Sequence, residues 1–224
     1  MKGEWLRRML RTLGIHVRRH DPTLPEIWSH DPEFLKILEE ISGRTLVAQD
    51  RLFMLFQLAR LTAPLPGAMA EVGVYRGGTA RLLARACPQK ALHLFDTFSG
   101  MPQADPSLDR HHQGDFADTS LAEVKEYLAD CPRLHFHPGL FPASAASLPP
   151  QPYALVYLDV DLYHSTKDGL EYFYPMLVKG GAIVCDDYEW KGCPGVKKAL
   201  DEFLAGKPEK VFVTARYQCA IIKS

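Results

Sequence analysis

Two pairs of aspartates are the residues of this chain best suited to chemistry: Asp159 with Asp161, and the adjacent Asp186 and Asp187. Each pair closes a short apolar run that is typical of a buried strand. Strands of an α/β sheet end at the ligand-binding crevice, so these carboxylates should face whatever the protein binds. Ionised carboxylates crowded together repel one another. Either one of them therefore has a raised pKa, or a cation lies among them.

A bound cation would be a hard one, Mg²⁺ or else Mn²⁺ or Ca²⁺, because the candidate ligand atoms are all oxygens. We expect Asp159, Asp186 and Asp187 to converge, since the two strand ends should be neighbours in the sheet. Consecutive strand residues point to opposite faces. Asp186 and Asp187 can therefore bind one ion only if the strand has already ended there.

A hydroxyl beside such a cation loses its proton more easily. Asp161, or as a second choice His164, is placed to accept that proton as a general base. The structural alternative is that Asp159 or Asp161 caps the helix that follows, where Ser165 and Thr166 are also good caps.

The segment 71–79 joins a predicted strand to a predicted helix and is rich in glycine. Gly73 and Gly78 would let the backbone approach a ligand closely at a helix N-terminus. A dinucleotide-binding fingerprint would need glycine in place of Tyr75, and a phosphate-binding P-loop would need lysine in place of Thr79. The spacing excludes both of these commoner sites.

Two acidic residues flank this loop. Glu71 ends the strand before it, and Asp96 follows Gly73 by 23 residues, near the offset of about 20 at which an acid accepts hydrogen bonds from ribose hydroxyls. An acid beside the loop is wrong for a pyrophosphate, but it suits a ligand with a ribose and a cationic end, such as S-adenosylmethionine. The alternative is a tight turn with two ordinary surface acids.

Composition excludes several classes of protein. The 224 residues carry 26 Lys and Arg against 27 Asp and Glu, so bulk nucleic-acid binding is not indicated. Five cysteines without a C-x-x-C pair argue against a disulfide framework and for a reducing, cytoplasmic location. Residues 4–13 form a basic amphipathic pattern, for which weak contact with a membrane surface competes with helix packing in the domain or in a dimer.

Periodicity predicts helices first and then an alternation of strands and helices. We expect an N-terminal helical segment, 1–62, that caps the substrate side or forms oligomer contacts, and an α/β domain, 63–224. The last two strands are separated by about three residues and must be antiparallel, which predicts an open, mostly parallel seven-stranded sheet with a C-terminal hairpin. The expected helices are 4–13, 33–41, 47–61, 79–87, 121–128, 165–177 and 195–204, and the expected strands are 68–72, 91–95, 134–137, 153–158, 182–185, 210–214 and 218–223.

The segment of about 97–118 is too long for a mere connector, which makes it a candidate lid or binding loop. Four residues in or near the predicted crevice are weaker candidates for its wall: His111, His112, Tyr188 and Trp190.

Several of these blocks in order resemble the macrocin O-methyltransferase family over about residues 45–205. The matching blocks are 71–79, 94–102, 114–118, 159–166, 174–181 and 186–188. The resemblance implies a Rossmann-like class I methyltransferase fold and S-adenosylmethionine as donor. It also implies Mg²⁺ on Asp159, Asp186 and Asp187, Asp161 as general base, and a homo-oligomer. Within the first two blocks, the expected cofactor-binding residues are Glu71, Gly73, Tyr75, Gly78, Thr79, Asp96, Thr97 and Phe98.

The acceptor expected from this resemblance is a sugar or glycoside hydroxyl, on a small molecule or a glycan. Two other functions stay open from the sequence. The same metal mechanism would serve the vicinal oxygens of a catechol-like small molecule. A binding or scaffold protein with a vestigial site would need no chemistry, although the intact set of acidic residues counts against it.

Overall fold

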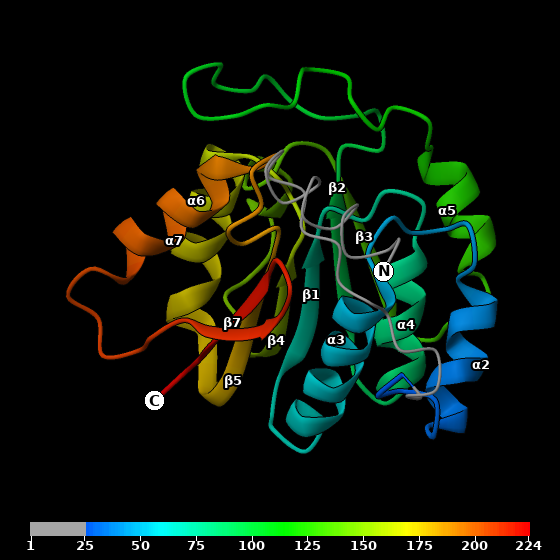
Figure 1. Ribbon diagram of the computed structural model, residues 1–224. Helices are drawn as coiled ribbons and strands as arrows, with labels where there is room; N and C mark the ends of the chain where they lie inside the picture. The colour runs from blue at the N-terminus through cyan, green and yellow to red at the C-terminus, as the bar shows by residue number, and fades with distance from the viewer. Residues whose placement is uncertain (1–25) are drawn as a thin grey trace, which may run out of the picture.

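The apolar runs predicted as strands pair into one seven-stranded sheet of order β3-β2-β1-β4-β5-β7-β6. It lies at the centre of the computed structural model, which describes residues 26–224 (Figure 1). The first five strands are parallel, whereas β7 runs antiparallel to β5 and β6 antiparallel to β7. The predicted sheet and C-terminal hairpin are therefore confirmed. The strands are β1 (Ala68–Val72), β2 (Leu92–Asp96), β3 (Leu134–Pro138), β4 (Tyr153–Leu158), β5 (Leu177–Asp186), β6 (Phe212–Ala215) and β7 (Gln218–Ile222).

Helices cover both faces of this sheet, because its central strands are apolar on both sides (Figure 1). In β4, Leu155 and Tyr157 belong to a core shared with α2 (Pro32–Glu40), α3 (Gln49–Thr62), α4 (Gly78–Ala86) and α5 (Leu121–Tyr127). Val156 and Leu158 belong to a second core, shared with α6 (Tyr163–Phe173) and α7 (Pro194–Leu204). Two 3₁₀ turns, η1 (Ala143–Ala145) and η2 (Tyr174–Met176), complete the described elements.

The helices before the sheet are packed onto it. Asp31 caps α2 by accepting a hydrogen bond of 3.0 Å from the amide of Phe34, as its position before a proline predicts. Phe34 and Phe56 are fully buried in the same core as Met69 of β1. The predicted helix 4–13 and its basic face lie outside the described residues. Among the described residues, none of the helices combines the length and apolar character that crossing a bilayer requires.

The main difference from the predicted elements lies after α6. The helix predicted to run to residue 177 ends at Phe173, and a 3₁₀ turn carries the chain straight into β5. Pro175 explains the early end, since it has no amide hydrogen to continue the helix. The strand therefore begins at Leu177, five positions before the predicted start. A smaller difference is at β6, which begins at Phe212 rather than at 210.

The sheet brings three strand ends together at its centre. In the register of the parallel pairs, Val72 of β1 lies beside Leu158 of β4, which lies beside Cys185 of β5. The residues that follow these three positions carry the glycine loop and the two aspartate pairs. Candidate site residues predicted from separate stretches of sequence thus lie together at one edge of the sheet.

Candidate active site

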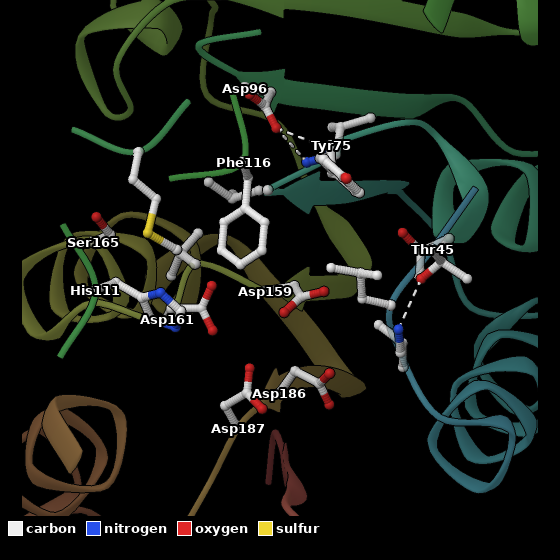
Figure 2. A pocket seen from close by; sticks show the side chains of 18 of the residues that line it. Thr45, Tyr75, Asp96, His111, Phe116, Asp159, Asp161, Ser165, Asp186 and Asp187 are labelled. Carbon is white, nitrogen blue, oxygen red and sulfur yellow. Dashed lines mark hydrogen bonds between the residues drawn. The ribbon is translucent and has the colours of Figure 1, made fainter. Parts of the chain in front are cut away.

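A cavity of about 690 Å³ opens at the carboxyl ends of the central strands (Figure 2). Its walls come from the glycine loop, the two aspartate clusters, the N-terminal part of α3 and the long segment between β2 and α5. That segment contributes Met101, His111 and Phe116, which agrees with its prediction as a binding loop. The volume is in the range of sites for drug-sized ligands.

The floor of the cavity carries three carboxylates that converge (Figure 2). One oxygen from each of Asp159, Asp186 and Asp187 lies within 4.8 Å of the others. The alternation of strand side chains does not separate the adjacent pair, because β5 ends at Asp186 and Asp187 adopts a left-handed backbone with φ of 58°. Aspartate tolerates this conformation better than most residues. The geometric condition for a shared ion is therefore met.

Arg51 of α3 is a cavity residue that the sequence analysis did not identify. Its Nη1 lies 2.6 Å from Oδ2 of Asp186 and 3.1 Å from Oδ1 of Asp187. Asp186 also accepts a hydrogen bond of 3.2 Å from the side-chain amide Nε2 of Gln218. Arg51 precedes Asp186 by 135 residues, and no local motif surrounds it, so nothing in the sequence singled it out from the other arginines.

Burial and mutual repulsion shape the electrostatics of the carboxylates. Burial, and then the charges of neighbouring aspartates, raise the pKa of Asp159 well above its usual range. Burial also raises the pKa of Asp186 to about 7, although the charge of Arg51 opposes this shift. A divalent cation would favour the ionised forms of both groups. The all-oxygen donor set and this crowding of negative charge fit a hard cation such as Mg²⁺.

Asp161 lies in the cavity wall beside this cluster, and its carboxylate accepts a hydrogen bond of 3.1 Å from Sγ of Cys193. Its backbone is also left-handed, with φ of 58°. Burial, and then interaction with Asp187, raise the pKa of Asp161 well above its usual range. His164, the second candidate base, is not part of the cavity wall. Its side chain is 68% exposed and lies 4.0 Å from the carboxylate of Asp105.

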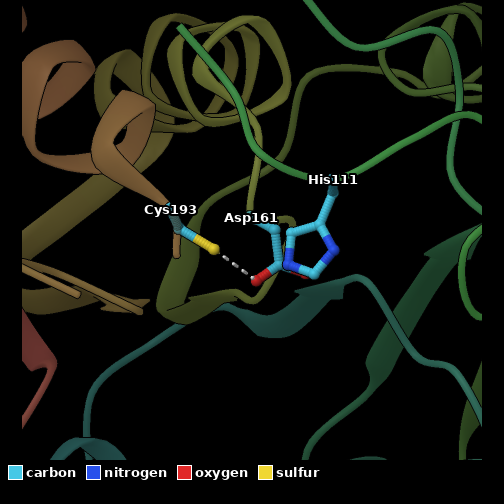
Figure 3. Close-up of side chains that lie close together, drawn as sticks. All are labelled: His111, Asp161 and Cys193. Carbon is cyan, nitrogen blue, oxygen red and sulfur yellow. Dashed lines mark hydrogen bonds between the residues drawn. The ribbon is translucent and has the colours of Figure 1, made fainter. Parts of the chain in front are cut away.

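His111 approaches Asp161 from the long loop (Figure 3). One ligand atom from each of His111, Asp161 and Cys193 lies within 4.8 Å of the other two. The imidazole Nδ1 of His111 also lies 3.1 Å from the carboxylate of Asp115. Loop position alone could not distinguish this histidine from His112, which is exposed and is not among the residues that line the cavity.

The glycine loop is pressed against the end of β4. Gly73 has φ of +90°, and a Cβ at this position would lie 1.9 Å from the carbonyl oxygen of Asp159. Only glycine fits there. Asp96 holds the loop by accepting hydrogen bonds from the amides of Val74 and Tyr75, at 2.6 and 2.9 Å, and faces the cavity (Figure 2). Gly78 was also predicted to bind the cofactor, but its backbone amide donates to the carbonyl of Arg44.

Glu71 lies beneath the cavity, fully buried, and is not one of its lining residues. One of its oxygens accepts a hydrogen bond from the hydroxyl of Thr79, and the other has no partner among the described residues. Burial raises the pKa of Glu71 to about 8. An unpartnered buried oxygen at this place fits a bound ligand that brings a positive charge close to it.

Some of the remaining predicted residues line the cavity, and others do not. Those that line the cavity are Gly73, Tyr75, Thr79, Asp96 and Thr97 from the predicted cofactor set, together with Trp190. Gly78, Phe98 and Tyr188 do not line it. Phe98 and Tyr188 are buried side chains, 6% and 8% exposed.

Comparison with known proteins identifies the family to which this site belongs. The sequence model of the family described as "Macrocin-O-methyltransferase (TylF)" matches residues 41–210, which include every strand end that forms the cavity floor. The chain belongs to this family. The family match confirms the resemblance seen in the sequence.

Characterised relatives of the family have similar sequences. The chain is 31% identical over 157 residues to demethyldecarbamoylnovobiocin O-methyltransferase of Streptomyces niveus. This match covers 63% of the chain and 59% of that protein. It is 34% identical over 145 residues to 8-demethyl-8-(2,3-dimethoxy-alpha-L-rhamnosyl)-tetracenomycin-C 4'-O-methyltransferase of Streptomyces olivaceus. This match covers 58% of the chain and 56% of that protein. The chain thus spans somewhat under three fifths of the length of these relatives.

Solved structures agree with the fold. The O-methyltransferase NovP superposes with a TM-score of 0.73 at 26% identity, over 81% of this chain and 82% of that one. CalS11, a calicheamicin methyltransferase, has a TM-score of 0.67 at 21% identity over 92% of this chain and 99% of that one, which supports the fold alone. The predicted class I methyltransferase fold is therefore confirmed.

Proposed function

We propose that this protein transfers a methyl group from S-adenosylmethionine to a hydroxyl of a sugar or glycoside, with Mg²⁺ held by Asp159, Asp186 and Asp187. The observation that carries the proposal is the convergence of these three carboxylates within 4.8 Å on the floor of a cavity that begins at a methyltransferase glycine loop. The family match and the O-methyltransferases among the relatives support the class of reaction, and the relative whose name includes a rhamnosyl group supports the class of acceptor.

The glycine loop and the two acidic residues beside it form the proposed donor site. Gly73 would admit the donor close to the sheet, and Asp96, which lines the cavity, would accept hydrogen bonds from its ribose. Glu71, buried behind the loop with one oxygen unpartnered, would favour a positive charge nearby. S-adenosylmethionine, when bound, supplies the electrophilic methyl group. Mg²⁺, when bound, supplies the charge that lowers the pKa of the acceptor hydroxyl.

Asp161 then has the part of general base. It lies in the cavity wall next to the proposed cation ligands, where a carboxylate can accept the proton of a hydroxyl held beside the cation. Cys193 and His111 flank its carboxylate and restrict its orientation. No covalent intermediate is required, because alignment of the hydroxyl with the methyl group and charge placement supply the rate.

The decisive experiment is a methyl-transfer assay over a panel of antibiotic glycosides, nucleotide sugars and catechols, each with and without EDTA. We expect transfer to a glycoside that EDTA reduces at least tenfold and excess Mg²⁺ restores. Transfer at full rate in EDTA would contradict the metal-dependent mechanism. Transfer to catechols alone would favour the alternative acceptor class, and a failure to bind S-adenosylmethionine in calorimetry would favour a binding or scaffold protein.

The cytoplasmic location, the homo-oligomer and the weak contact of residues 4–13 with a membrane surface stay predictions from the sequence. So do the division of the chain at residue 62 and the absence of nucleic-acid binding. Size-exclusion chromatography with light scattering would test the oligomer directly. Vesicle co-sedimentation of the full chain, compared with a variant that lacks residues 1–20, would test the membrane contact.

A further inference from the structure

Cys193, Asp161 and His111 form a second group of potential metal ligands, beside the three carboxylates and chemically distinct from them (Figure 3). The group joins the start of α7, the end of β4 and the long loop, so it exists only in the folded chain. It offers one sulfur, one oxygen and one nitrogen. The mechanism proposed above makes no use of the cysteine as a ligand.

We infer that Cys193, Asp161 and His111 form an inhibitory site for a soft divalent cation, Zn²⁺, separate from the proposed Mg²⁺ site. Thiolate, imidazole and carboxylate are the three side-chain ligands of protein zinc, whereas Mg²⁺ selects oxygen. With a neutral imidazole, a thiolate and a carboxylate balance the charge of one Zn²⁺.

The distances fit a tetrahedral ion after small adjustments. Bonds of about 2.0–2.3 Å to zinc place neighbouring ligand atoms roughly 3.4–3.7 Å apart. The sulfur of Cys193 and Oδ1 of Asp161 are 3.1 Å apart, and all three ligand atoms lie within 4.8 Å of one another. His111 and Asp161 line the cavity, so an ion can enter from there and keep its fourth position open toward it.

The histidine is also oriented as a metal ligand. The carboxylate of Asp115 lies 3.1 Å from Nδ1 of His111 and accepts a hydrogen bond of 2.9 Å from the backbone amide of His112. This leaves Nε2 for a cation. A carboxylate behind the imidazole is the usual support of a zinc-bound histidine, because it fixes the tautomer and the ring orientation.

An ion at this site would occupy the carboxylate of Asp161, the proposed base. Zn²⁺ would therefore inhibit methyl transfer even when Mg²⁺ is present. This consequence rests on the proposed function, whereas binding of the ion does not. A cysteine binds zinc as the thiolate, so the ion must displace the thiol proton of Cys193. We therefore expect binding to weaken as the pH falls.

Spectroscopy with Co²⁺, a coloured substitute for Zn²⁺, tests the binding without any methyl transfer. Co²⁺ is titrated into the full-length protein with Mg²⁺ in excess. We expect a near-ultraviolet thiolate-to-cobalt charge-transfer band, which the all-oxygen site cannot produce. The band should disappear in Cys193→Ser, remain in the matched control Cys131→Ser, and require at least tenfold more Co²⁺ in His111→Ala.

Each other result has a definite meaning. Binding of Co²⁺ in calorimetry without a thiolate band would overturn the inference, and so would a band that persists in Cys193→Ser. If Cys193→Ser does not fold, the loop variant His111→Ala still decides the matter, because an unchanged titration excludes the site. In the activity assay, Cys193→Ser should need at least tenfold more Zn²⁺ for half-inhibition. Inactive wild-type protein that still gives the band would count against the proposed function only.

Discussion

The guanidinium of Arg51 lies 2.6 Å from Oδ2 of Asp186, and so joins a helix that precedes the sheet to the last residue of β5. The side chain of Arg51 is 14% exposed and that of Asp186 is 1% exposed, so this is a largely buried ion pair. The same arginine also reaches Asp187. Two of the three proposed Mg²⁺ ligands therefore already have a cationic partner, and a metal ion must share their oxygens with it.

Substitution of Arg51 should distinguish its contribution to stability from that of Mg²⁺. We expect Arg51→Gln to lower the melting temperature in EDTA by several degrees, because removing one partner of a buried pair costs about 3–5 kcal/mol. Mg²⁺ should then raise the melting temperature more than in the wild type, since the competing charge is gone. Thermal unfolding with and without Mg²⁺ measures both effects.

Arg60→Gln is the matched control, because Arg60 lies in the same helix, its side chain is 52% exposed, and its ion-pair partners Asp31 and Glu33 are themselves partly exposed. It should change neither value by more than about a degree. A smaller Mg²⁺ effect in Arg51→Gln than in the wild type would mean that Arg51 positions the carboxylates for the metal instead of competing with it.

The base is tested by two substitutions, each of which removes one candidate proton acceptor. We expect Asp161→Asn to lower kcat by roughly 10²–10⁴, the usual contribution of a general base, with Mg²⁺ binding in calorimetry changed less than threefold. His164→Asn should retain wild-type activity, because that side chain lies outside the cavity wall. The reverse pattern would move the base to His164.

The long loop is fastened to α6 by Asp109. This residue is 5% exposed, and its Oδ1 accepts a hydrogen bond of 2.9 Å from the amide of Tyr163, the first residue of the helix. We expect Asp109→Ala to destabilise the protein by about 1 kcal/mol, as the loss of a helix cap does. It should also make the segment 97–118 more sensitive to limited proteolysis. Ser107→Ala, in an exposed part of the same loop, should do neither.

A buried histidine predicts loss of stability in acid. Burial, and then the neighbouring His135 and His137, lower the pKa of His93 to about 4 in the folded protein, from about 6.5 in an unfolded chain. Between these values the unfolded state binds the extra proton. The contribution of His93 is therefore intact above pH ~6.5 and is lost progressively as the pH falls to ~4, by roughly 3 kcal/mol in total.

Chemical denaturation at pH 7.5 and pH 5 measures this loss. In His93→Asn the difference between the two pH values should shrink, although His137, whose pKa burial also lowers, keeps part of it. An unchanged difference would mean that other groups cause the acid sensitivity.

The fold could be predicted from the sequence because its signals are local. Apolar runs, the cap at Asp31 and the glycine loop each act within a few residues. The aspartates at strand ends were predictable for the same reason, since parallel strands place their ends together. Arg51 and Cys193 were not, because their roles depend on contacts between distant segments. His111 was a candidate for the cavity wall, but its approach to Asp161 could not be predicted from loop position. Glu71 shows a further limit. Its position at the end of a strand predicted a cavity residue, but packing buries its side chain behind the cavity wall.

The cap formed by Asp109 has a consequence for how ligands enter and leave. The carboxylate that starts α6 belongs to the loop that carries His111 and Phe116 into the cavity wall. Swinging that loop outward would uncap a helix, at a cost of about 1 kcal/mol. We therefore expect the contact between Asp109 and the first residue of α6 to control the exchange of donor and product. This contact lies on the opposite face of the sheet from α3, the helix that carries Arg51.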